Sequence, residues 1–334
     1  MTSRSDQPLL SVRNLVIEFA TRYGPARAVD GVSFDVYQNE TLGIVGESGC
    51  GKTVTGLALL GLIPSPPGRI VSGEILLQGR DLAALPEEEL QSLRGDEISM
   101  IFQEPMTALN PVLKIGTQMV DVLRRHRGLT RKQARASAIE MLAKVGIPAP
   151  DKRIDEYPHQ MSGGMRQRVM IGMALSCNPK LLIADEPTTA LDVTTQAQVL
   201  EQIVKLQDEF NMAVILITHD LGVVAETCHR ALVMYCGEIV EQANIEVLFE
   251  QPRHPYTRGL LDSIPRLRPE KLAELPIIPG MVPDLMHLPV GCRFGDRCSR
   301  VSDECRLQRP HLDIDAISHD AVACFHPLSP SESM

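Results

Sequence analysis

Residues 46–53 read Gly-Glu-Ser-Gly-Cys-Gly-Lys-Thr, which is the spacing G-x-x-x-x-G-K-[ST] of a loop that binds a nucleoside triphosphate. Glycines let successive backbone N–H groups turn toward phosphate oxygens at the start of a helix. Lys52 is placed to reach the β- and γ-phosphates, and Thr53 is placed to hold Mg²⁺. We call residues 46–53 the phosphate loop. The expected nucleotide contacts within it are Gly46, Glu47, Ser48, Gly49, Cys50, Gly51, Lys52 and Thr53.

Two adjacent carboxylates follow a second apolar run. Residues 180–187 read Lys-Leu-Leu-Ile-Ala-Asp-Glu-Pro, which is typical of a buried strand that ends where ligands bind at the edge of a parallel sheet. Asp185 is placed to organise Mg²⁺ and its waters, and Glu186 to polarise an attacking water. The alternative is an exposed acidic turn, which the presence of a phosphate loop disfavours.

Two further polar groups stand at the ends of expected elements. His219 follows the apolar run 213–217 and is able to hydrogen-bond a γ-phosphate. Ser162-Gly163-Gly164 precedes the helix-like run 165–177, where free N–H groups form a second phosphate receptor. Taken singly, a structural histidine and a capped turn are the alternatives. Together with the phosphate loop, these groups give one chain two receptors for phosphate.

The elements that position these groups indicate an α/β protein. Apolar patterns predict strands over 9–20, 32–36, 41–45 and 71–77, with a helix over 54–62, so an antiparallel β region surrounds the phosphate loop. Helical patterns dominate 112–145, with Thr130 as the expected cap of a helix over 131–145. From Leu181 onward short strands alternate with helices, which predicts a parallel sheet.

Composition limits the partners of the chain. It has 334 residues, 33 of them basic and 42 acidic, for a net charge of −9, which gives no general attraction to nucleic acid or to anionic lipid. No apolar run approaches the roughly 18 residues of a membrane span, and the first residues lack the hydrophobic region of a secretory signal. We therefore expect a cytosolic chain that reaches a membrane only through protein partners.

The ordered motifs resemble the nucleotide-binding domains of ABC transporters. The resemblance covers residues 9 to about 250 and is specific, because five motifs fall in the same order at matching spacings. It implies an ABC-type domain over 1–250, with a RecA-like parallel sheet core, an antiparallel β subdomain and a helical subdomain at about 104–160. In that family two domains face head to tail, and each nucleotide lies between one phosphate loop and the other subunit's Ser-Gly-Gly signature. This arrangement accounts for the second receptor. The motifs that carry the resemblance are 46–53, Gln103, 161–165, Asp185-Glu186, Ala190-Leu-Asp192 and His219.

The resemblance also implies residue roles. Phe19 stacks on adenine, with Tyr23 as the alternative. Gln103 joins Thr53 and Asp185 at Mg²⁺ and senses the attacking water. Asp192 lies at the dimer seam, and His219 acts as the γ-phosphate switch beside the catalytic Glu186.

Three positions depart from the commonest patterns of the family. Cys50 replaces a usual Ser, which leaves phosphate binding by backbone N–H groups intact but places a thiol in the loop. Met161 and Met165 replace the usual Leu and Gln at the two ends of the signature. Because Ser162, Gly163 and Gly164 are retained, we expect a hydrolytic site.

The tail narrows the resemblance to dipeptide and oligopeptide importer ATPases. Pro252-Arg-His-Pro-Tyr-Thr257, followed by Gly259-Leu-Leu, is similar to their C-terminal extension, here 251–334, and residues 100–111 are similar to a phrase typical of the same group. The Pro-rich residues 264–290 indicate a linker.

Four of the eight cysteines lie within this extension, at the spacing C-x5-C-x6-C-x18-C. In a cytosolic chain, ligation by thiolates is favoured over disulfides. Zinc usually prefers tighter pairs, whereas iron–sulfur clusters tolerate irregular spacing, and the resemblance also favours a [4Fe–4S] cluster; zinc and unligated thiols remain alternatives. Cysteines 177, 228 and 236 lie in apolar segments and are expected in the core. The expected ligands are Cys292, Cys298, Cys305 and Cys324.

The resulting prediction is the ATPase subunit of an importer of di- or oligopeptides, on the cytoplasmic face of the inner membrane. Expected cofactors are ATP and Mg²⁺, and expected partners are a second ATPase subunit, identical or paralogous, two transmembrane permeases and an extracytoplasmic solute-binding protein. Nickel or glutathione import by the same broad group is an alternative. A regulatory subunit, or an ABC-type ATPase acting on DNA or ribosomes, is a more remote one, since the chain lacks a second nucleotide domain and a coiled-coil insertion.

Overall fold

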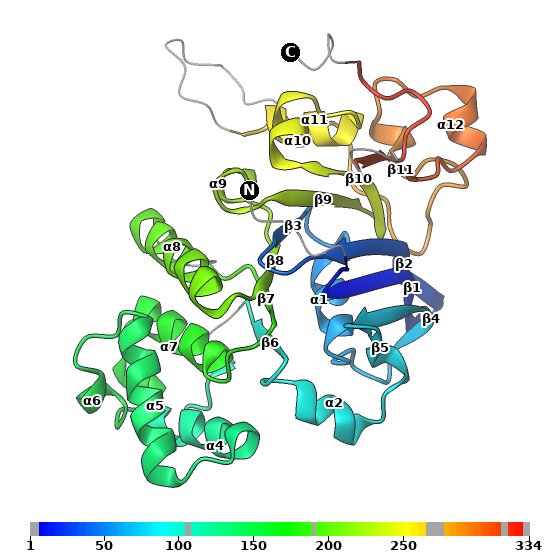
Figure 1. Cartoon of the computed structure of the whole chain (residues 1–334). Coiled ribbons are helices and arrows are strands. Elements are labelled where there is room, and N and C mark those ends of the chain that lie inside the picture. Colours follow the sequence, from blue (N-terminus) through cyan, green and yellow to red (C-terminus); the bar gives the residue numbers. More distant parts are fainter. Residues whose placement is uncertain (1–6, 104–107, 189–191, 265–276, 315–319, 330–334) are drawn as a thin grey trace, which may run out of the picture. The chain divides into compact units, whose positions relative to one another are not determined.

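The computed structural model describes residues 7–103, 108–188, 192–264, 277–314 and 320–329 (Figure 1). Contacts within the chain divide it into two compact units. As far as they are described, unit 1 comprises residues 1–9, 36–40 and 84–216, and unit 2 comprises 10–35, 41–83 and 217–334. The phosphate loop and the C-terminal extension therefore belong to the same compact unit.

Unit 2 contains a four-stranded antiparallel sheet in the order β2-β1-β4-β5. Alternating apolar residues of β1, among them Val12, Leu15 and Ile17, are fully buried, and an irregularity between Arg13 and Ile17 shifts the register against β4. The prediction of strands over 9–20 and 71–77 is confirmed, whereas the strand expected at 32–36 begins earlier. The strands are β1 (Leu10–Thr21), β2 (Gly24–Val36), β4 (Gly68–Leu77) and β5 (Arg80–Asp81).

A second group of strands in unit 2 carries the phosphate loop at its centre. Strand β3 (Thr41–Val45) is buried at every position and pairs in parallel with β9 (Arg230–Tyr235). Strand β10 (Glu238–Asn244) pairs antiparallel with β9, and the tail strand β12 (Ala321–Val322) adds to β10, followed by β11 (Asp313–Ile314). The tail thus continues the sheet of the nucleotide-binding region.

Helices of unit 2 follow these strands. The phosphate loop leads from β3 into α1, and His254 caps α11 by accepting the N–H of Tyr256 at its Nδ1. Among the described residues, the helices of unit 2 are α1 (Lys52–Leu59), α9 (Leu221–Thr227), α10 (Ile245–Glu250), α11 (Pro255–Asp262), η3 (Gly295–Arg297) and α12 (Asp303–Leu307), and η1 (Leu82–Ala84) ends at the first residue of the next segment of unit 1.

Unit 1 contains three buried strands in the order β8-β7-β6. Strand β6 (Ile98–Ile101) pairs in parallel with β7 (Leu181–Asp185), with Ile101 opposite Ala184, and β8 spans Ala213–Ile217. The predicted parallel sheet is confirmed for the pair of β6 and β7. Because the carboxyl ends of β6 and β7 lie at the same edge, the residues after them are neighbours.

Helices dominate the rest of unit 1, where α4 to α7 pack together (Figure 1). Thr130 caps α5 as predicted, with a capping box that Gln133 completes. Among the described residues of this unit the helices are α2 (Glu87–Leu93), α4 (Ile115–Arg127), α5 (Arg131–Lys144), α6 (Pro150–Arg153), η2 (Pro158–Gln160), α7 (Gly163–Leu175) and α8 (Val193–Phe210).

In the described part of the chain, no helix is both long enough and apolar enough to cross a bilayer. The division into domains at 1–250 and 251–334 stays a prediction. Residues 104–107, 190–191 and 265–276, which fall in the predicted helical subdomain, the Ala-Leu-Asp motif and the predicted linker, lie outside the described residues.

Candidate functional site

The phosphate loop has a backbone that only glycine supports at two positions. Gly46 has φ 151° and Gly51 has φ 104°. A Cβ at Gly46 would lie 2.2 Å from the carbonyl oxygen of Met234, and one at Gly51 would lie 2.4 Å from that of Ala28. The loop therefore keeps its curvature only if these two positions have no side chain, because the backbone of Ala28 and Met234 lies too close to them.

Lys52 lies inside the loop. Its side chain is buried, with the residue only 6% exposed, and its ammonium donates to the carbonyl oxygens of Gly46 at 2.7 Å and Glu47 at 3.1 Å. Thr53 is exposed on the first turn of α1. A buried ammonium enclosed by a glycine cradle at a helix N-terminus fits the binding of a triphosphate, and the exposed hydroxyl of Thr53 fits the coordination of Mg²⁺.

The Cys50 thiol faces inward. It is 1% exposed, and its Sγ lies 3.8 Å from Lys52 Nζ. Burial raises the pKa of this thiol, although Lys52 opposes the shift. The loop therefore holds a neutral and shielded thiol.

The predicted hydrolytic residues of unit 1 come together at the ends of β6 and β7. Gln103 donates from Nε2 to Glu186 Oε2 at 2.9 Å. Asp185 is 2% exposed at the end of β7, and Glu186 has a left-handed φ of 46°. Such a conformation costs energy in a residue other than glycine and is common at active sites. A carboxylate held by an amide in this way is placed to accept a proton from water.

The Ser-Gly-Gly segment starts helix α7. Ser162 caps it by accepting the N–H of Met165 at 3.3 Å, and a Cβ on Gly163 would meet nothing within 4 Å. A Cβ on Gly164 would lie 3.1 Å from Cγ2 of Thr195 in α8. The start of α7 is thus open on one side, where its N–H groups are available to an anion.

Asp192 caps helix α8. Its carboxylate accepts the N–H of Thr195 at 3.0 Å and the hydroxyl of the same residue at 2.7 Å, and these bonds lower the pKa of Asp192. The residue is exposed. Its place at the dimer seam stays a prediction beside this capping role.

His219 is exposed after β8, directly before Asp220, which caps α9. Of the two candidate adenine platforms, the ring of Phe19 is half-buried and packs on Gly68, where a Cβ would lie 2.8 Å from the ring. Tyr23, in the turn after β1, is 75% exposed, with the guanidinium of Arg22 4.8 Å from its ring centroid.

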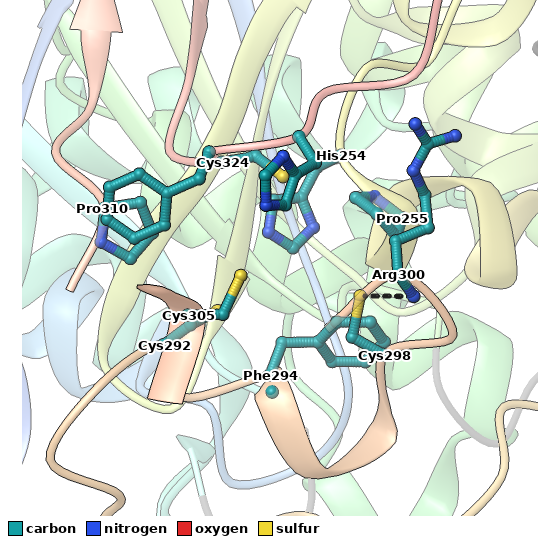
Figure 2. Close-up of a pocket in the computed structure, with 12 residues that line it drawn as sticks. His254, Pro255, Cys292, Phe294, Cys298, Arg300, Cys305, Pro310 and Cys324 are labelled. Carbon is teal, nitrogen blue, oxygen red and sulfur yellow. Dashed lines mark hydrogen bonds between the residues drawn. The ribbon is translucent and has the colours of Figure 1, made fainter. Parts of the chain in front are cut away.

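The four tail cysteines line one hollow in unit 2, which Figure 2 shows together with His254 and Phe294. In the described part of the chain, no three His, Cys, Asp or Glu side chains converge closely enough for a single ion. Burial raises the pKa of the Cys292 and Cys298 thiols and that of the Cys324 thiol to about 11. We call the hollow lined by Cys292, Cys298, Cys305 and Cys324 the cysteine hollow.

Comparisons with known proteins decide the family. Residues 29–189 match the model of the ABC transporter family, and residues 240–305 match that of the C-terminal region of oligopeptide/dipeptide transporters. The oligopeptide transport ATP-binding protein AppD of Bacillus subtilis is 52% identical over 95% of this chain and 96% of its own. The chain belongs to the ATP-binding subunits of ABC transporters. Its enzymatic class is therefore that of an ATPase coupled to transport.

Other members of the family agree with this assignment. The dipeptide transport ATP-binding protein DppD of Escherichia coli K12 is 48% identical over 96% of this chain and 97% of its own. The dimeric ATP-binding cassette MJ0796, solved with ADP and Pi, has a TM-score of 0.64 at 26% identity and covers 71% of this chain and 98% of its own. The predicted ABC-type fold is thus confirmed.

Gln103 and Glu186 were each singled out from the sequence, whereas their hydrogen bond and the contacts of Glu47 were not predicted. The N–H of Glu47 donates to the hydroxyl of Tyr256 at 2.9 Å, and its carboxylate accepts two bonds from Arg297. The only sequence signals were that Tyr256 lies within the tail motif and that Arg297 stands next to Cys298, a predicted ligand. Glu47 was predicted to contact nucleotide, and the structure directs its side chain to the extension. The individual roles of the other site residues stay predictions.

Of the cysteines outside the tail, Cys177 and Cys236 are fully buried, as predicted. Cys228 is only partly buried and packs beside Gly43, where its Sγ would lie 3.1 Å from a Cβ. It nevertheless packs against the buried core cluster of unit 2, so the prediction of a core position is confirmed in part for Cys228.

Proposed function

We propose that this subunit hydrolyses ATP to power the import of di- or oligopeptides. Two observations support this substrate class: the relatives at 48% and 52% identity are named for dipeptide and oligopeptide transport, and the tail matches the C-terminal region of such transporters. We further propose that it works on the cytoplasmic face of the membrane with a second ATPase subunit, two permeases and an extracytoplasmic solute-binding protein.

The hydrogen bond between Gln103 and Glu186 is the observation that carries the hydrolytic part of the proposal. Glu186 accepts the proton of the attacking water, and Gln103 orients its carboxylate. Lys52 binds the β- and γ-phosphates, and His219 hydrogen-bonds the γ-phosphate. Thr53, Asp185 and Gln103 are the residues that would hold Mg²⁺, which neutralises charge on the triphosphate.

The subunit carries two phosphate receptors, which supports a head-to-tail dimer. The start of α7 offers N–H groups on its open side, and Ser162 to Gly164 bind the nucleotide held by the phosphate loop of the other subunit. ATP binding closes the pair, and hydrolysis reopens it.

Replacing Glu186 by Gln tests the hydrolytic assignment. Without the carboxylate that accepts the proton, we expect kcat to fall by roughly 100-fold or more while ATP binding and ATP-dependent dimerisation persist. Steady-state phosphate release and size-exclusion chromatography with ATP measure the two effects. Glu201→Gln, an exposed carboxylate on α8, is the matched control. Full turnover in Glu186→Gln would contradict the assignment.

An aromatic ring of the β1–β2 hairpin stacks on adenine. Phe19 is the ring that the family pattern indicates, but the 75% exposure of Tyr23 supports the neighbouring ring instead. Equilibrium binding of ATP and of inorganic triphosphate to Tyr23→Ala and Phe19→Ala distinguishes them. The stacking residue is the one whose loss weakens ATP binding alone.

The cysteine hollow binds a [4Fe–4S] cluster in this proposal. A zinc ion needs its ligand atoms about 2 Å from one point, and the described residues do not converge in that way. Four thiols line the same hollow, and a cluster, which is larger than a single ion, accepts ligands that lie farther apart. When bound, the group joins four thiolates; here it is proposed to hold the extension together.

Metal analysis tests the proposed cluster. Protein purified anaerobically is analysed for iron, acid-labile sulfide and zinc, with Cys324→Ser as the variant that lacks one ligand. We expect about four irons and four sulfides per chain. One zinc without iron would replace the cluster by a zinc site, and the absence of both metals would remove the ligation hypothesis.

A further inference from the structure

The C-terminal extension contacts the phosphate loop directly. Tyr256, at the start of α11, is fully buried, and its hydroxyl accepts the N–H of Glu47 at 2.9 Å. Burial raises the pKa of this phenol, so the hydroxyl stays neutral. The second residue of the phosphate loop therefore has its backbone donor fixed by the tail.

Arg297 fixes the side chain of the same residue. Its guanidinium donates to both carboxylate oxygens of Glu47, at 2.6 and 3.0 Å, and the side chain is 4% exposed. The remaining donors reach the carbonyl oxygen of Pro279 at 3.0 Å and the hydroxyl of Tyr235 at 3.4 Å. A two-pronged and shielded pair of this kind permits little freedom in either partner.

A second arginine of the extension supports the back of the loop. Arg293 donates to the carbonyl oxygen of Cys236 and pairs with Asp30. The next residue, Gly237, donates its N–H to the carbonyl oxygen of Cys50 at 2.9 Å and accepts the N–H of Asp30 at 2.8 Å. The extension thus contacts the phosphate loop directly at Glu47, and it contacts residues 236–237, which in turn hydrogen-bond Cys50.

Both arginines lie in the segment between two cysteines of the hollow. Gly295 donates its N–H to the carbonyl oxygen of Cys292 at 3.0 Å, and Cys298 donates its N–H to that of Gly295 at 3.2 Å. Phe294 lines the hollow, as Figure 2 shows, and its ring centroid lies 5.3 Å from those of both Tyr235 and Tyr256. The conformation of this segment therefore determines both the positions of two cysteines in the hollow and the contacts of Arg297 with Glu47.

We propose that Arg297 is a positioning residue for the phosphate loop, and that the group bound in the cysteine hollow sets the affinity for ATP through it. Ligation of Cys292 and Cys298 fixes the two ends of the segment that carries Arg297. Arg297 then holds Glu47, and with it the start of the loop that cradles phosphate. This inference rests on the proposed ATPase function and on ligation by the hollow.

Arg297→Gln tests the first step, with the equilibrium binding of methylanthraniloyl-ATP and Mg²⁺ as the readout. Loss of the pair leaves the Glu47 carboxylate half-buried without its partner, and we expect binding to weaken at least 10-fold. In steady-state assays KM for ATP rises, while kcat stays within about 2-fold because Glu186 and Gln103 are unchanged. Arg297→Lys retains one charged donor and restores part of the affinity.

Two further variants make the binding result specific. Arg306→Gln removes an exposed arginine of the same extension and leaves ATP affinity unchanged. Glu47→Gln removes the negative charge and one of the two acceptor oxygens without altering the tail, so it weakens ATP binding even if Arg297→Gln fails to fold. Wild-type affinity in Glu47→Gln, or in a folded Arg297→Gln, overturns the proposal. An absence of ATP binding by the wild type would instead overturn the proposed function.

Cys324→Ser tests the second step, because Cys324 lines the hollow but lies outside the segment that carries the arginines. Iron and zinc content and ATP affinity are measured on the same samples. We expect metal loss together with weaker ATP binding, and no additional weakening when Cys324→Ser is combined with Arg297→Gln. Cys228→Ala, which removes a thiol outside the hollow, retains both properties. Metal loss at unchanged ATP affinity overturns the coupling, as does a fully additive double variant.

Discussion

At the scale of single residues, the phosphate loop combines positions that the motif dictates with one that it leaves open. Gly46, Gly51 and Lys52 have the places that the motif predicts, because sterics and charge leave no other residue type. Glu47 stands at a variable position of the motif, so its type carried no signal. Its partners are more than 200 residues away in the sequence, at separations of 209 and 250 positions. Sequence patterns therefore could not predict that Glu47 contacts Tyr256 and Arg297.

A prediction at this scale concerns Cys50. Because the thiol is 1% exposed and its pKa is raised, we expect N-ethylmaleimide to modify it at least 10-fold more slowly in the native protein than after unfolding in urea. Peptide mass spectrometry measures both rates. Cys50→Ser is expected to change ATP affinity by less than about 3-fold, since phosphate is bound by backbone N–H groups. Rapid native modification would show that the thiol is accessible.

At the scale of elements, the sequence predicted the strands and the helix cap that depend on residues close to one another in the chain. Strands β3, β7 and β8 are mostly apolar runs that are buried throughout. Thr130 could be predicted as the cap of α5 because a capping side chain bonds within the first turn of its helix. The tail was predicted as an importer-type extension with a linker over 264–290 and a four-cysteine cluster, but without strands. Its two-residue strands β11 and β12 are too short to show a period and exist because β10 offers an edge. Tertiary pairing, which the sequence does not display, decides them.

The prediction for this scale compares two glycines of the extension. A Cβ on Gly291 would lie 2.1 Å from the carbonyl oxygen of Cys305, whereas the nearest atom to a Cβ on Gly295 is 3.7 Å away. We therefore expect Gly291→Ala to destabilise the extension by about 1–3 kcal/mol and Gly295→Ala to have little effect. Hydrogen exchange of peptides within 291–307 measures the free energy of local opening. Equal exchange in both variants would contradict the described packing.

At the scale of the whole molecule, the composition predicts which partners are disfavoured but does not identify the assembly. A net charge of −9 disfavours nucleic acid, and this exclusion stays a prediction. Head-to-tail pairing came only from the surplus receptor and the family resemblance. The structure adds the open side of Gly163 at the start of α7, where an added Cβ would meet no described atom within 4 Å. Pairing involves two molecules, so a single chain and its sequence do not display it.

Replacement of Ser162 by Arg tests that pairing. In a Glu186→Gln background, the added bulk and charge at the open start of α7 should prevent ATP-dependent dimerisation, because they occupy the place of the other subunit's nucleotide. Binding of ATP to the subunit's own phosphate loop should persist. Size-exclusion chromatography and equilibrium binding separate the two effects. Ala136→Arg, at an exposed site of α5, controls for the added charge. A dimer that survives Ser162→Arg would place the signature outside the interface.

The pairing of Glu47 with Arg297 has an evolutionary consequence. Two side chains that depend on each other this closely are expected to change together across species, so an acidic residue at position 47 should accompany an arginine at position 297. Family members that end before such a tail are free to vary at position 47. A gene fusion or truncation that discards the tail would then select for compensating changes at the start of the phosphate loop.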